Sequence, residues 1–392
     1  MTVILFLSSC LSLAIWLVLL FGRGGFWRVR LGEPSVRMEA ATPWPNVCAV
    51  VPARNEADVV GEALTSLLVQ DYPGAFHVIL VDDHSTDGTA AVAEAAALAA
   101  HCPERLTIVS AAPLPEGWSG KVWAQAQGIA AARERQSEDG FFLLTDADIG
   151  HPPDAVTRLV RCAEDEKRDL VSLMVRLRCA SFWEKATTPA FVFFFAKLYP
   201  FAWVADPRRK TAAAAGGCML VRARALDEAG GMAAIRGELI DDCSLAARIK
   251  HRGDGFHPIR LDLASESRSL RPYESWRDIW NMVARTAFTQ LRYSPVILAG
   301  TTLGMAVIYL VPPASALALG LQGWPGWLAW AAMCWAYAPM LRYYSRSLLW
   351  SPLLPLIALF YMGATLASAW RYWSGRGGQW KSRIQAPSVQ AS

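Results

Sequence analysis

Two aspartates one residue apart follow an apolar run in the middle of the chain. Residues 141–145 are expected to form a buried strand, and Asp146 and Asp148 stand just beyond it. In open α/β sheets, ligands bind at the edge where the strands end. Two carboxylates at that edge can hold a hard divalent cation, which in turn neutralises a diphosphate. Such a pair is also common in solvated turns, so its meaning depends on the residues around it.

Polar side chains follow two more of the expected strands. The strand at 47–51 is followed by a proline and three polar residues, and the strand at 78–81 by two aspartates. These residues are Pro52, Arg54, Asn55, Glu56, Asp82 and Asp83. A sheet does not need carboxylates at this edge for stability, so several of them together indicate a nucleotide and a metal. Residues 85–87 are expected to cap the next helix.

Two other segments carry charge beside glycine or at a helix start. The loop at 117–121, Gly-Trp-Ser-Gly-Lys, enters a helix, where the backbone can approach a phosphate and Lys121 can supply charge. The alternative is an ordinary turn with a solvated lysine. The loop does not match the Walker pattern, which disfavours a P-loop ATPase. Asp241 and Asp242 open a helix, where they either offset its dipole or present one carboxylate as a general base.

The elements that must position these residues alternate between strand and helix. Strands are expected at 47–51, 78–81, 106–109, 141–145 and 216–221, with helices at 58–70, 89–100, 122–133 and from 241 onward. This order predicts an α/β fold with a doubly wound, mostly parallel sheet.

A long apolar segment begins the chain. The 392 residues are 53% hydrophobic, which is more than an ordinary soluble enzyme needs. Residues 3–21 carry no charge, and about 19 residues at roughly 1.5 Å rise nearly span a bilayer core. A signal peptide is the competing interpretation, but no basic residue precedes the run and no small-residue cleavage site follows it. Arg23, Arg28 and Arg30 come next, which predicts an uncleaved anchor with its N-terminus outside.

The C-terminal third is also apolar. Residues 293–341 are uncharged and long enough for two passes, and residues 347–370 form a third candidate span. Three passes would leave the following basic tail outside, against the positive-inside tendency. Either one segment only dips into the bilayer or the tail breaks the rule. The predicted domains are an anchor at 1–22, a basic linker at 23–46, a catalytic domain with interfacial helices at 47–292, a transmembrane region at 293–370 and a polar tail at 371–392.

One further segment and the composition bear on membrane contact, nucleic-acid binding and cysteine chemistry. Residues 191–204 are apolar but too short and broken to span, so they form either a core helix or a helix lying in the membrane interface. The net charge of +4 is explained by basic residues near the membrane ends, and no Lys/Arg-rich run or aromatic RNA-binding motif indicates nucleic-acid binding. Eight cysteines without a C-x-x-C pair argue against a zinc site and a disulfide framework, and fit a reducing, cytosol-facing domain.

Four of these motifs, in this order, resemble the family 2 inverting glycosyltransferases of the GT-A fold, over about residues 47–285. They are Pro52-Ala-Arg-Asn55-Glu56, Asp82-Asp83-His-Ser-Thr-Asp87-Gly88, Asp146-Ala-Asp148 and Asp241-Asp242-Cys-Ser-Leu245. The resemblance implies a donor-binding set of Pro52, Arg54, Asn55, Glu56, Asp83, Lys121 and Asp146. It implies that Asp148 ligates Mg²⁺ or Mn²⁺ on the diphosphate. Asp242, in a catalytic pair with Asp241, would deprotonate the acceptor hydroxyl.

Two departures from the family pattern matter. The usual glutamate before the base is Asp241 here, a shorter acid that keeps the chemistry plausible. The Gln-x-x-Arg-Trp motif of polymerising members is missing, and residues 276–286 stand in its place with Arg285 as the expected diphosphate contact. The missing motif favours a single sugar transfer over processive polymer synthesis.

The segment 113–124, Pro-Leu-Pro-x-Gly-Trp-Ser-Gly-Lys followed by Val-Trp-Ala, narrows the resemblance. It looks like the hopanoid-biosynthesis-associated glycosyltransferases of bacteria, and carotenoid glycosyltransferases carry a similar loop. The implied protein is a multi-pass hexosyltransferase of the bacterial inner (cytoplasmic) membrane, with its catalytic domain in the cytosol. It would move one sugar from a nucleotide sugar, expected to be a UDP-sugar, to a hydroxyl of a hopanoid or another polyisoprenoid lipid. The alternatives are a carotenoid or polyprenyl-phosphate acceptor, or a catalytically inactive membrane scaffold of lipid synthesis.

Overall fold

The structure is a computed structural model that describes residues 2–32, 43–135, 138–376, 379–380 and 383–384. The chain divides into two compact units, each made of several stretches of sequence. The first unit comprises Met1–Val29, Cys179–Ala202 and Tyr273–Gly378, and the second comprises Arg30–Arg178, Trp203–Pro272 and Gln379–Ser392. Residues 33–42 of the expected linker and most of the expected tail beyond 376 lie outside the described residues.

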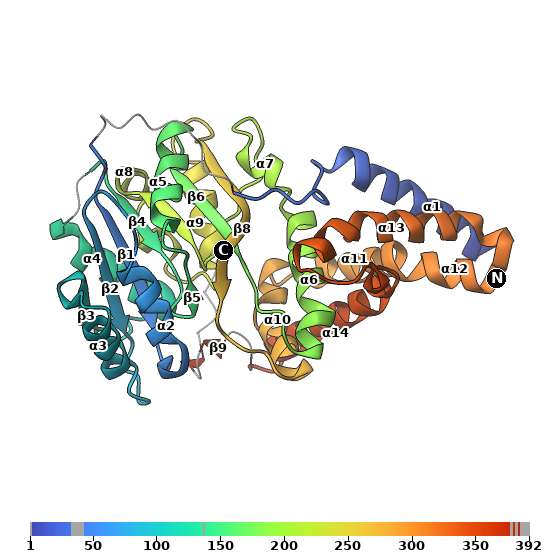
Figure 1. The fold of residues 1–392 in the computed structure, drawn as a ribbon. Helices are drawn as coiled ribbons and strands as arrows, with labels where there is room; N and C mark the ends of the chain where they lie inside the picture. Colours follow the sequence, from blue (N-terminus) through green and yellow to red (C-terminus); the bar gives the residue numbers. More distant parts are fainter. Residues whose placement is uncertain (1, 33–42, 136–137, 377–378, 381–382, 385–392) are drawn as a thin grey trace. The chain divides into compact units, whose positions relative to one another are not determined.

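The second unit is built on a mixed sheet (Figure 1). Its eight described strands follow the order β3-β2-β1-β4-β7-β6-β8-β5. They are β1 Val47–Ala53, β2 Phe76–Asp82, β3 Leu106–Ser110, β4 Phe141–Leu144, β5 Ile149–Gly150, β6 Leu170–Arg176, β7 Met219–Arg222 and β8 Ile259–Ser269. The first four in the order are parallel, while β7 is antiparallel to both of its neighbours. The predicted α/β fold is confirmed, and β7 makes its sheet mixed.

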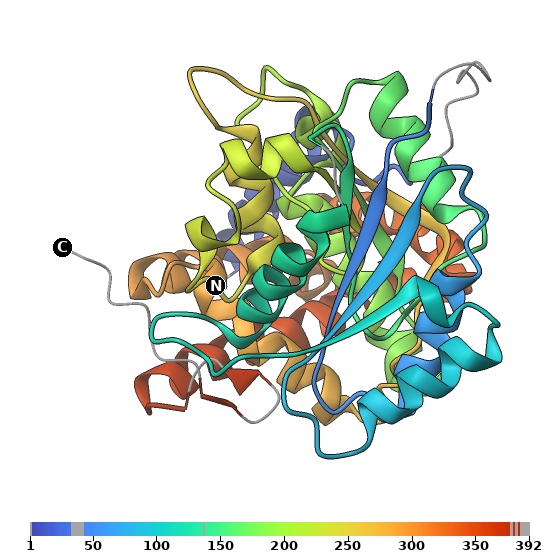
Figure 2. The same ribbon diagram turned by 90° about the vertical axis from the view of Figure 1, so that its left-hand side faces the viewer.

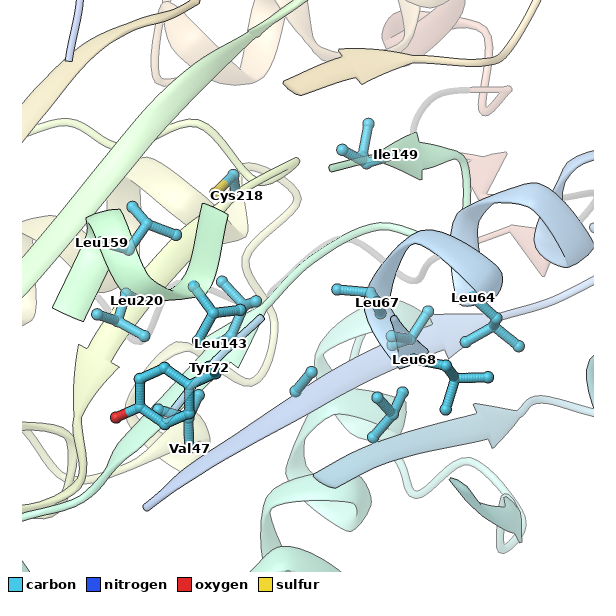
Figure 3. Packing of buried hydrophobic residues seen from close by; sticks show 14 of the residues in the cluster. Val47, Leu64, Leu67, Leu68, Tyr72, Leu143, Ile149, Leu159, Cys218 and Leu220 are labelled. Carbon is cyan, nitrogen blue, oxygen red and sulfur yellow. The ribbon is translucent and has the colours of Figure 1, made fainter. Parts of the chain in front are cut away.

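Helices cover both faces of the β1–β4 half of the sheet. The helices of the second unit are α2 Ala57–Leu68, α3 Thr89–Ala99, α4 Gly120–Ala132, α5 Ala155–Asp165, α8 Ala223–Glu228 and α9 Asp241–Lys250. Alternate residues of β1 join a buried cluster with α2, α3 and α5, of which Figure 3 shows Leu64, Leu67 and Leu159. On the other face, α4 crosses the strands (Figure 2), where Gly128 lies so close that an added Cβ would be 2.4 Å from Val50 Cγ1. Because both faces are covered, every residue of β1 is buried.

Strand β1 runs two residues beyond its predicted end and includes Pro52. Its pairing with β4 stops at Val50 and Leu144, while its pairing with β2 continues to Ala53. Val50 accepts a hydrogen bond from Thr145 on the β4 side, so Pro52, two residues on, also faces that side. Since no strand residue pairs there, the missing N–H of proline costs the sheet nothing.

The first unit is helical. Its helices are α1 Thr2–Gly22, α6 Phe182–Leu198, α10 Trp276–Gln290, α11 Pro295–Met305, α12 Val311–Leu319, α13 Trp324–Tyr343 and α14 Leu354–Trp373. Three stretches in the described residues are long and apolar enough to cross a membrane: Thr2–Gly22, Pro295–Tyr343 and Leu348–Trp373. The expected apolar helices at both ends of the chain are therefore confirmed. Along the chain, α7 Phe201–Ala205 follows Pro200, which separates it from α6.

The two prolines at 312 and 313 do not break the second apolar stretch. A π-helical turn, η4 Ala306–Leu310, joins α11 to α12 directly before the prolines, and Val311 N donates to Ala306 O across it. The chain instead reverses at η5 Gly320–Gly323, where Gly320 has φ +56°. This conformation favours glycine, and α13 then packs antiparallel to α12. A last 3-10 segment, η6 Leu348–Leu353, leads into α14.

Candidate active site

The polar residues that follow β1 and β2 contact each other. Arg54 Nη1 donates to the backbone carbonyl of Asp83 at 2.5 Å and lies 3.4 Å from its Oδ2. Asp83 is buried, with 2% of its surface exposed, so its carboxylate needs this cationic partner. The structure therefore brings together Arg54 and Asp83, two of the residues expected to bind the donor.

Asn55 holds the turn between β1 and α2. Its φ of +51° is left-handed, a conformation that asparagine tolerates better than most residues. Its Oδ1 accepts from Thr86 N at 2.8 Å, and Asp87 accepts from Ala57 N at 3.0 Å. Asp87 also accepts from Thr89 N, the first residue of α3, at 3.0 Å, so this member of the expected capping segment 85–87 does cap the helix. The N-cap of α3 is Gly88, which has no side chain that could cap it.

Lys121 connects acids from two distant parts of the chain. Its Nζ lies 2.8 Å from Asp146 Oδ1, just beyond β4, and 3.2 Å from Asp241 Oδ2, at the start of α9. Burial alone would lower the pKa of Lys121, but Asp146 and Asp241 outweigh it and raise the pKa. The lysine of the glycine-flanked loop is therefore a fixed cation in this cluster, rather than a solvated side chain.

Asp242 is held by the backbone. Its Oδ2 accepts from Gly216 N at 2.9 Å, and its Oδ1 accepts from Cys243 N at 2.7 Å. Glycine at 216 lets the backbone come close to the lysine, because an added Cβ would lie 3.1 Å from Lys121 Nζ. Burial, followed by the like charge of Asp241, raises the pKa of Asp242 to about 6. A carboxyl with this pKa is ionised at neutral pH, yet basic enough to accept a proton.

Arg271, just after β8, was not singled out from the sequence. Its Nε donates to Asp148 Oδ2 at 2.8 Å, and its guanidinium also pairs with Glu56. The antiparallel pairing of β5 with β8 brings this arginine beside the residues that follow β4. No spacing in the sequence signals that contact, since 123 positions separate Arg271 from Asp148.

The Arg271–Asp148 pair is electrostatically coupled to the cluster around Lys121. Burial raises the pKa of Asp146, with a further contribution from Asp148, while Lys121 opposes the shift. The charge of Asp148 therefore reaches Asp146. Asp146 pairs with Lys121, and Asp148 pairs with Arg271. Lys121 and Arg271, both largely buried, thus pair with four acids of this edge, Asp146, Asp241, Asp148 and Glu56, while Asp83 pairs with Arg54.

The residues fit a divalent ion that arrives with its substrate. No cluster of three or more histidine, cysteine, aspartate or glutamate side chains that could hold a metal is present in the part of the chain that the structure describes. Mg²⁺ is commonly bound through one or two carboxylates together with substrate phosphates and water. Asp148, with its partner Arg271 able to turn toward a phosphate, satisfies that requirement.

Lys250 is a second residue that sequence reasoning missed. It is fully buried at the end of α9, and its Nζ donates to the carbonyl oxygens of Val204 at 2.7 Å, Asp206 at 3.1 Å and Thr211 at 2.8 Å. A buried cation is tolerated when its donors are satisfied in this way. Lys250 thus fixes the helix that carries Asp242 to the loop that leads to Gly216.

Two expected site residues need separate mention. Pro52 is buried inside β1, beyond the last residue that pairs with β4, and its side chain has no polar group to present. Arg285 lies on α10 of the first unit and is exposed. Its expected diphosphate contact stays a prediction.

Two family models match the chain. The model described as "Glycosyl transferase family 2" matches residues 48–230, and the model described as "Glycosyl transferase family group 2" matches residues 141–363, more than half of the chain. The chain belongs to glycosyl transferase family 2. The matched regions include the strand ends and the α9 start described above.

Curated relatives of this family 2 glycosyltransferase match only part of their own length. Beta-monoglucosyldiacylglycerol synthase of Synechocystis sp. (strain ATCC 27184 / PCC 6803 / Kazusa) is 36% identical over 132 residues, 32% of this chain and 25% of that protein. An N-acetylglucosaminyltransferase of Rhizobium leguminosarum bv. viciae is 36% identical over 124 residues, 31% of this chain and 26% of that protein. The matching segment thus spans about a quarter of these relatives.

Among solved structures, the mannosyltransferase PcManGT from Pyrobaculum calidifontis, in complex with GDP-Man and Mn²⁺, is similar to almost the whole chain. The match covers 95% of this chain and 99% of that one, with a TM-score of 0.53 and 20% identity. At that identity, the likeness shows the shared GT-A fold.

Proposed function

We propose that this glycosyltransferase moves one sugar from a nucleotide-sugar donor to a hydroxyl of a hopanoid or another polyisoprenoid lipid, with inversion at the anomeric carbon. The observation that carries the proposal is the cluster of Lys121, Asp146 and the Asp241–Asp242 pair, in which one carboxylate is held by backbone N–H groups beside a buried cation. A structural ion pair would not need two adjacent acids and a glycine at close approach.

Asp242 is the proposed general base. With its pKa near 6 it is ionised at neutral pH and accepts the proton of the acceptor hydroxyl. The acceptor oxygen then bonds to the anomeric carbon as the bond from that carbon to the diphosphate oxygen breaks. One displacement at that carbon inverts its configuration.

Cations of the chain are placed to stabilise the leaving diphosphate. Lys121 and Arg271 each pair with an aspartate, and each can exchange part of that contact for phosphate oxygens. Asp148, with phosphate oxygens and water, would hold Mg²⁺ or Mn²⁺, which supplies further neutralisation of the diphosphate. Arg54, Asn55, Glu56, Asp83 and Asp146 would bind the nucleoside and the donor sugar, beside Pro52.

The lipid acceptor is proposed from three features together. The chain has apolar helices of membrane-spanning length at both ends. Its 113–124 loop resembles that of the hopanoid-associated enzymes, and one curated relative is named beta-monoglucosyldiacylglycerol synthase. We place the protein in the bacterial inner membrane, organised as an anchor, a catalytic domain that faces the cytosol, and a C-terminal membrane region, with a UDP-sugar as the expected donor.

A substrate panel tests the proposal. Purified protein in detergent is incubated with UDP- and GDP-sugars, Mg²⁺ or Mn²⁺, and each of four acceptors: a hopanoid alcohol, a carotenoid acid, a polyprenyl phosphate and diacylglycerol. Mass spectrometry is expected to find a singly glycosylated hopanoid whose anomeric configuration is opposite to that of the donor. Product with another acceptor alone would overturn the hopanoid assignment. No product with any acceptor, and full rescue of a deletion strain by Asp242→Asn, would favour the scaffold alternative.

A further inference from the structure

The last apolar stretch, Leu348–Trp373, has the length of a transmembrane helix, but its contacts within the first unit indicate that it does not cross the membrane. Its depth in the membrane can be judged against the bundle of α1, α12 and α13. Phe6 of α1 and Trp324 of α13 meet at one end, with ring centroids 6.5 Å apart. The η5 reversal joins α12 to α13 at that same end, because it directly precedes Trp324.

The opposite end of the bundle is equally well marked. Helix α1 finishes at Gly22 and α13 finishes at Tyr343. Since α11, η4 and α12 run antiparallel to α13, the start of α11 at Pro295 lies at this end as well. Trp16, near the end of α1, donates to the carbonyl of Ile308 at 2.9 Å and packs edge-on against Tyr309. In Figure 1, α1, α12 and α13 extend to the end marked N, while α14 stops short of it.

After Tyr343 the chain turns back toward the middle of the bundle. Trp330 Nε1 donates to the carbonyl of Pro352 at 3.2 Å, and the Cys334 thiol shares a hydrogen bond with the Ser351 side chain. At roughly 1.5 Å per helical residue, Trp330 and Cys334 lie about 20 and 14 Å from the end of α13. The η6 segment therefore reaches about half the depth of a bilayer core of roughly 30 Å.

Helix α14 then returns to the end from which η6 departed. Its last turn packs against the residues that precede α11: Tyr372 stacks on Tyr293 at 4.4 Å. One turn earlier, Ser368 Oγ accepts from Phe288 N at 3.0 Å, while Arg371, next to Tyr372, donates to Asn281 Oδ1 at 2.6 Å. Because Tyr293 stands at the start of α11, the end of α14 lies at the Tyr343 end of the bundle.

We infer that residues 344–373 form a re-entrant hairpin, which enters the bilayer with η6 and leaves it with α14 on the same side. The occupant of its outer surface is the lipid of one leaflet. Leu349 of η6 is 83% exposed and Leu356 of α14 is 65% exposed, although both belong to the helical unit that contains the membrane bundle. This inference concerns the membrane path of the chain and does not depend on the proposed sugar chemistry.

The charge pattern agrees with this path. Arg23, Arg292, Arg342, Arg346, Arg371 and Arg376 all follow or precede helix ends on the Tyr343 side. The η5 turn at the other end carries no charge. With α14 re-entrant, every one of these arginines is on the cytosolic side, as the positive-inside rule favours. The conflict that three C-terminal passes would create disappears.

Tag accessibility in the full-length chain tests the number of crossings. A short epitope is added at the N-terminus, at the C-terminus or within the η5 turn, and each protein is probed with antibody in spheroplasts and in inverted membrane vesicles. Three crossings place the N-terminal and η5 epitopes outside and the C-terminal epitope inside. A C-terminal epitope on the same side as the N-terminal one means that α14 crosses, and overturns the inference.

A disulfide test locates the tip of the hairpin. Ser351→Cys should form a disulfide with the native Cys334 when membranes are treated with copper phenanthroline, as identified by mass spectrometry of peptides. Ser347→Cys, at the start of η6, is the matched control and should not link to Cys334. Folded, monodisperse Ser351→Cys protein without the disulfide, or equal linking by the control, would contradict the depth assigned to η6.

Discussion

Asp242 and its backbone donors allow a sharp test at the level of one side chain. Asp242→Asn keeps the shape of the side chain, and its one amide oxygen can still accept from either Gly216 N or Cys243 N, but it removes the proton acceptor. We expect kcat to fall by about 10²- to 10⁴-fold, the usual contribution of a general base, while the nucleotide dissociation constant stays within a few-fold. Asp227→Asn, which alters an exposed ion pair with Arg133, is the control and should leave kcat unchanged. Normal turnover by the Asp242 variant would remove it from the mechanism.

The raised pKa of Asp242 predicts a pH profile. The base works only when it is deprotonated, so kcat/KM should rise with pH through about 6 and level off near neutrality. The sign follows from the burial and the neighbouring Asp241, which both favour the protonated form at lower pH. Steady-state rates between pH 5 and 8 measure the profile. A rate that stays constant between pH 5 and 7 would mean that Asp242 does not titrate in the reaction.

Arg271 predicts an effect on metal binding in the absence of nucleotide. Its guanidinium pairs with Asp148, the proposed metal ligand, and a charge-assisted hydrogen bond of this kind is worth about 1.5–3 kcal/mol. Arg271→Gln should therefore lower the Mn²⁺ dissociation constant by roughly 10- to 150-fold, as measured by electron paramagnetic resonance of free Mn²⁺. Arg268→Gln, three residues earlier in β8, alters an exposed pair with Glu62 of α2 and is the control. Equal Mn²⁺ affinity in all three proteins would argue that Asp148 does not bind the ion.

At the scale of residues, the sequence predicts which side chains belong to the site better than it predicts which side chains they contact. Asp146, Asp148 and Asp242 could be singled out because each follows a strand or opens a helix. The partners of Lys121 could not, since Asp146 and Asp241 reach it from separate elements. Arg271 carries no local signal at all, because it depends on the pairing of β5 with β8.

At the level of elements, the contact between α4 and the sheet positions Lys121. Gly128→Ala would place a Cβ 2.4 Å from Val50 Cγ1 and 2.9 Å from Val81 Cγ2. We expect a loss of about 1–3 kcal/mol in unfolding free energy from overpacking, together with lower activity, because α4 must shift. Gly61→Ala on α2 is the matched control: its Cβ meets only Val92 Cγ1, at 3.3 Å, and alanine favours the helix. Chemical denaturation in detergent measures both, and equal stabilities would contradict the packing argument.

The prediction of elements succeeded where the pattern was local. Continuous apolar runs gave β1, β2 and β4 within two residues at each end, and glycine or proline marked where helices stop. Strands β6 and β8 were not predicted, although β8 alternates buried and exposed residues toward its C-terminal end. The antiparallel direction of β7 could not be deduced either, because it depends on long-range pairing rather than on a local pattern.

For the whole molecule, the packing of α1 predicts how mutations in this helix change the stability of the protein in detergent. Trp16 is fully buried, whereas Val18, two residues on, is 67% exposed. By analogy with other buried aromatic residues, Trp16→Ala should cost about 3–5 kcal/mol. It should lower the melting temperature in detergent without changing nucleotide affinity, since Trp16 belongs to the first unit and the donor site to the second. Val18→Ala should leave both unchanged, and a Trp16 variant as stable as Val18→Ala would mean that α1 is not packed in this way.

The hydrogen bond from Trp16 to Ile308 joins residues 292 positions apart, which has a consequence for biosynthesis. A ribosome that adds about 5–20 residues per second needs roughly 15–60 s to make the intervening chain. Throughout that interval α1 is already translated, while the indole N–H of Trp16 and the hydroxyls of Ser9 and Ser12 have no packed bundle around them. If α1 inserts into the membrane as it is made, it would therefore lack its packing partners for roughly 15–60 s, and a chaperone that shields polar groups of nascent helices would act during that time.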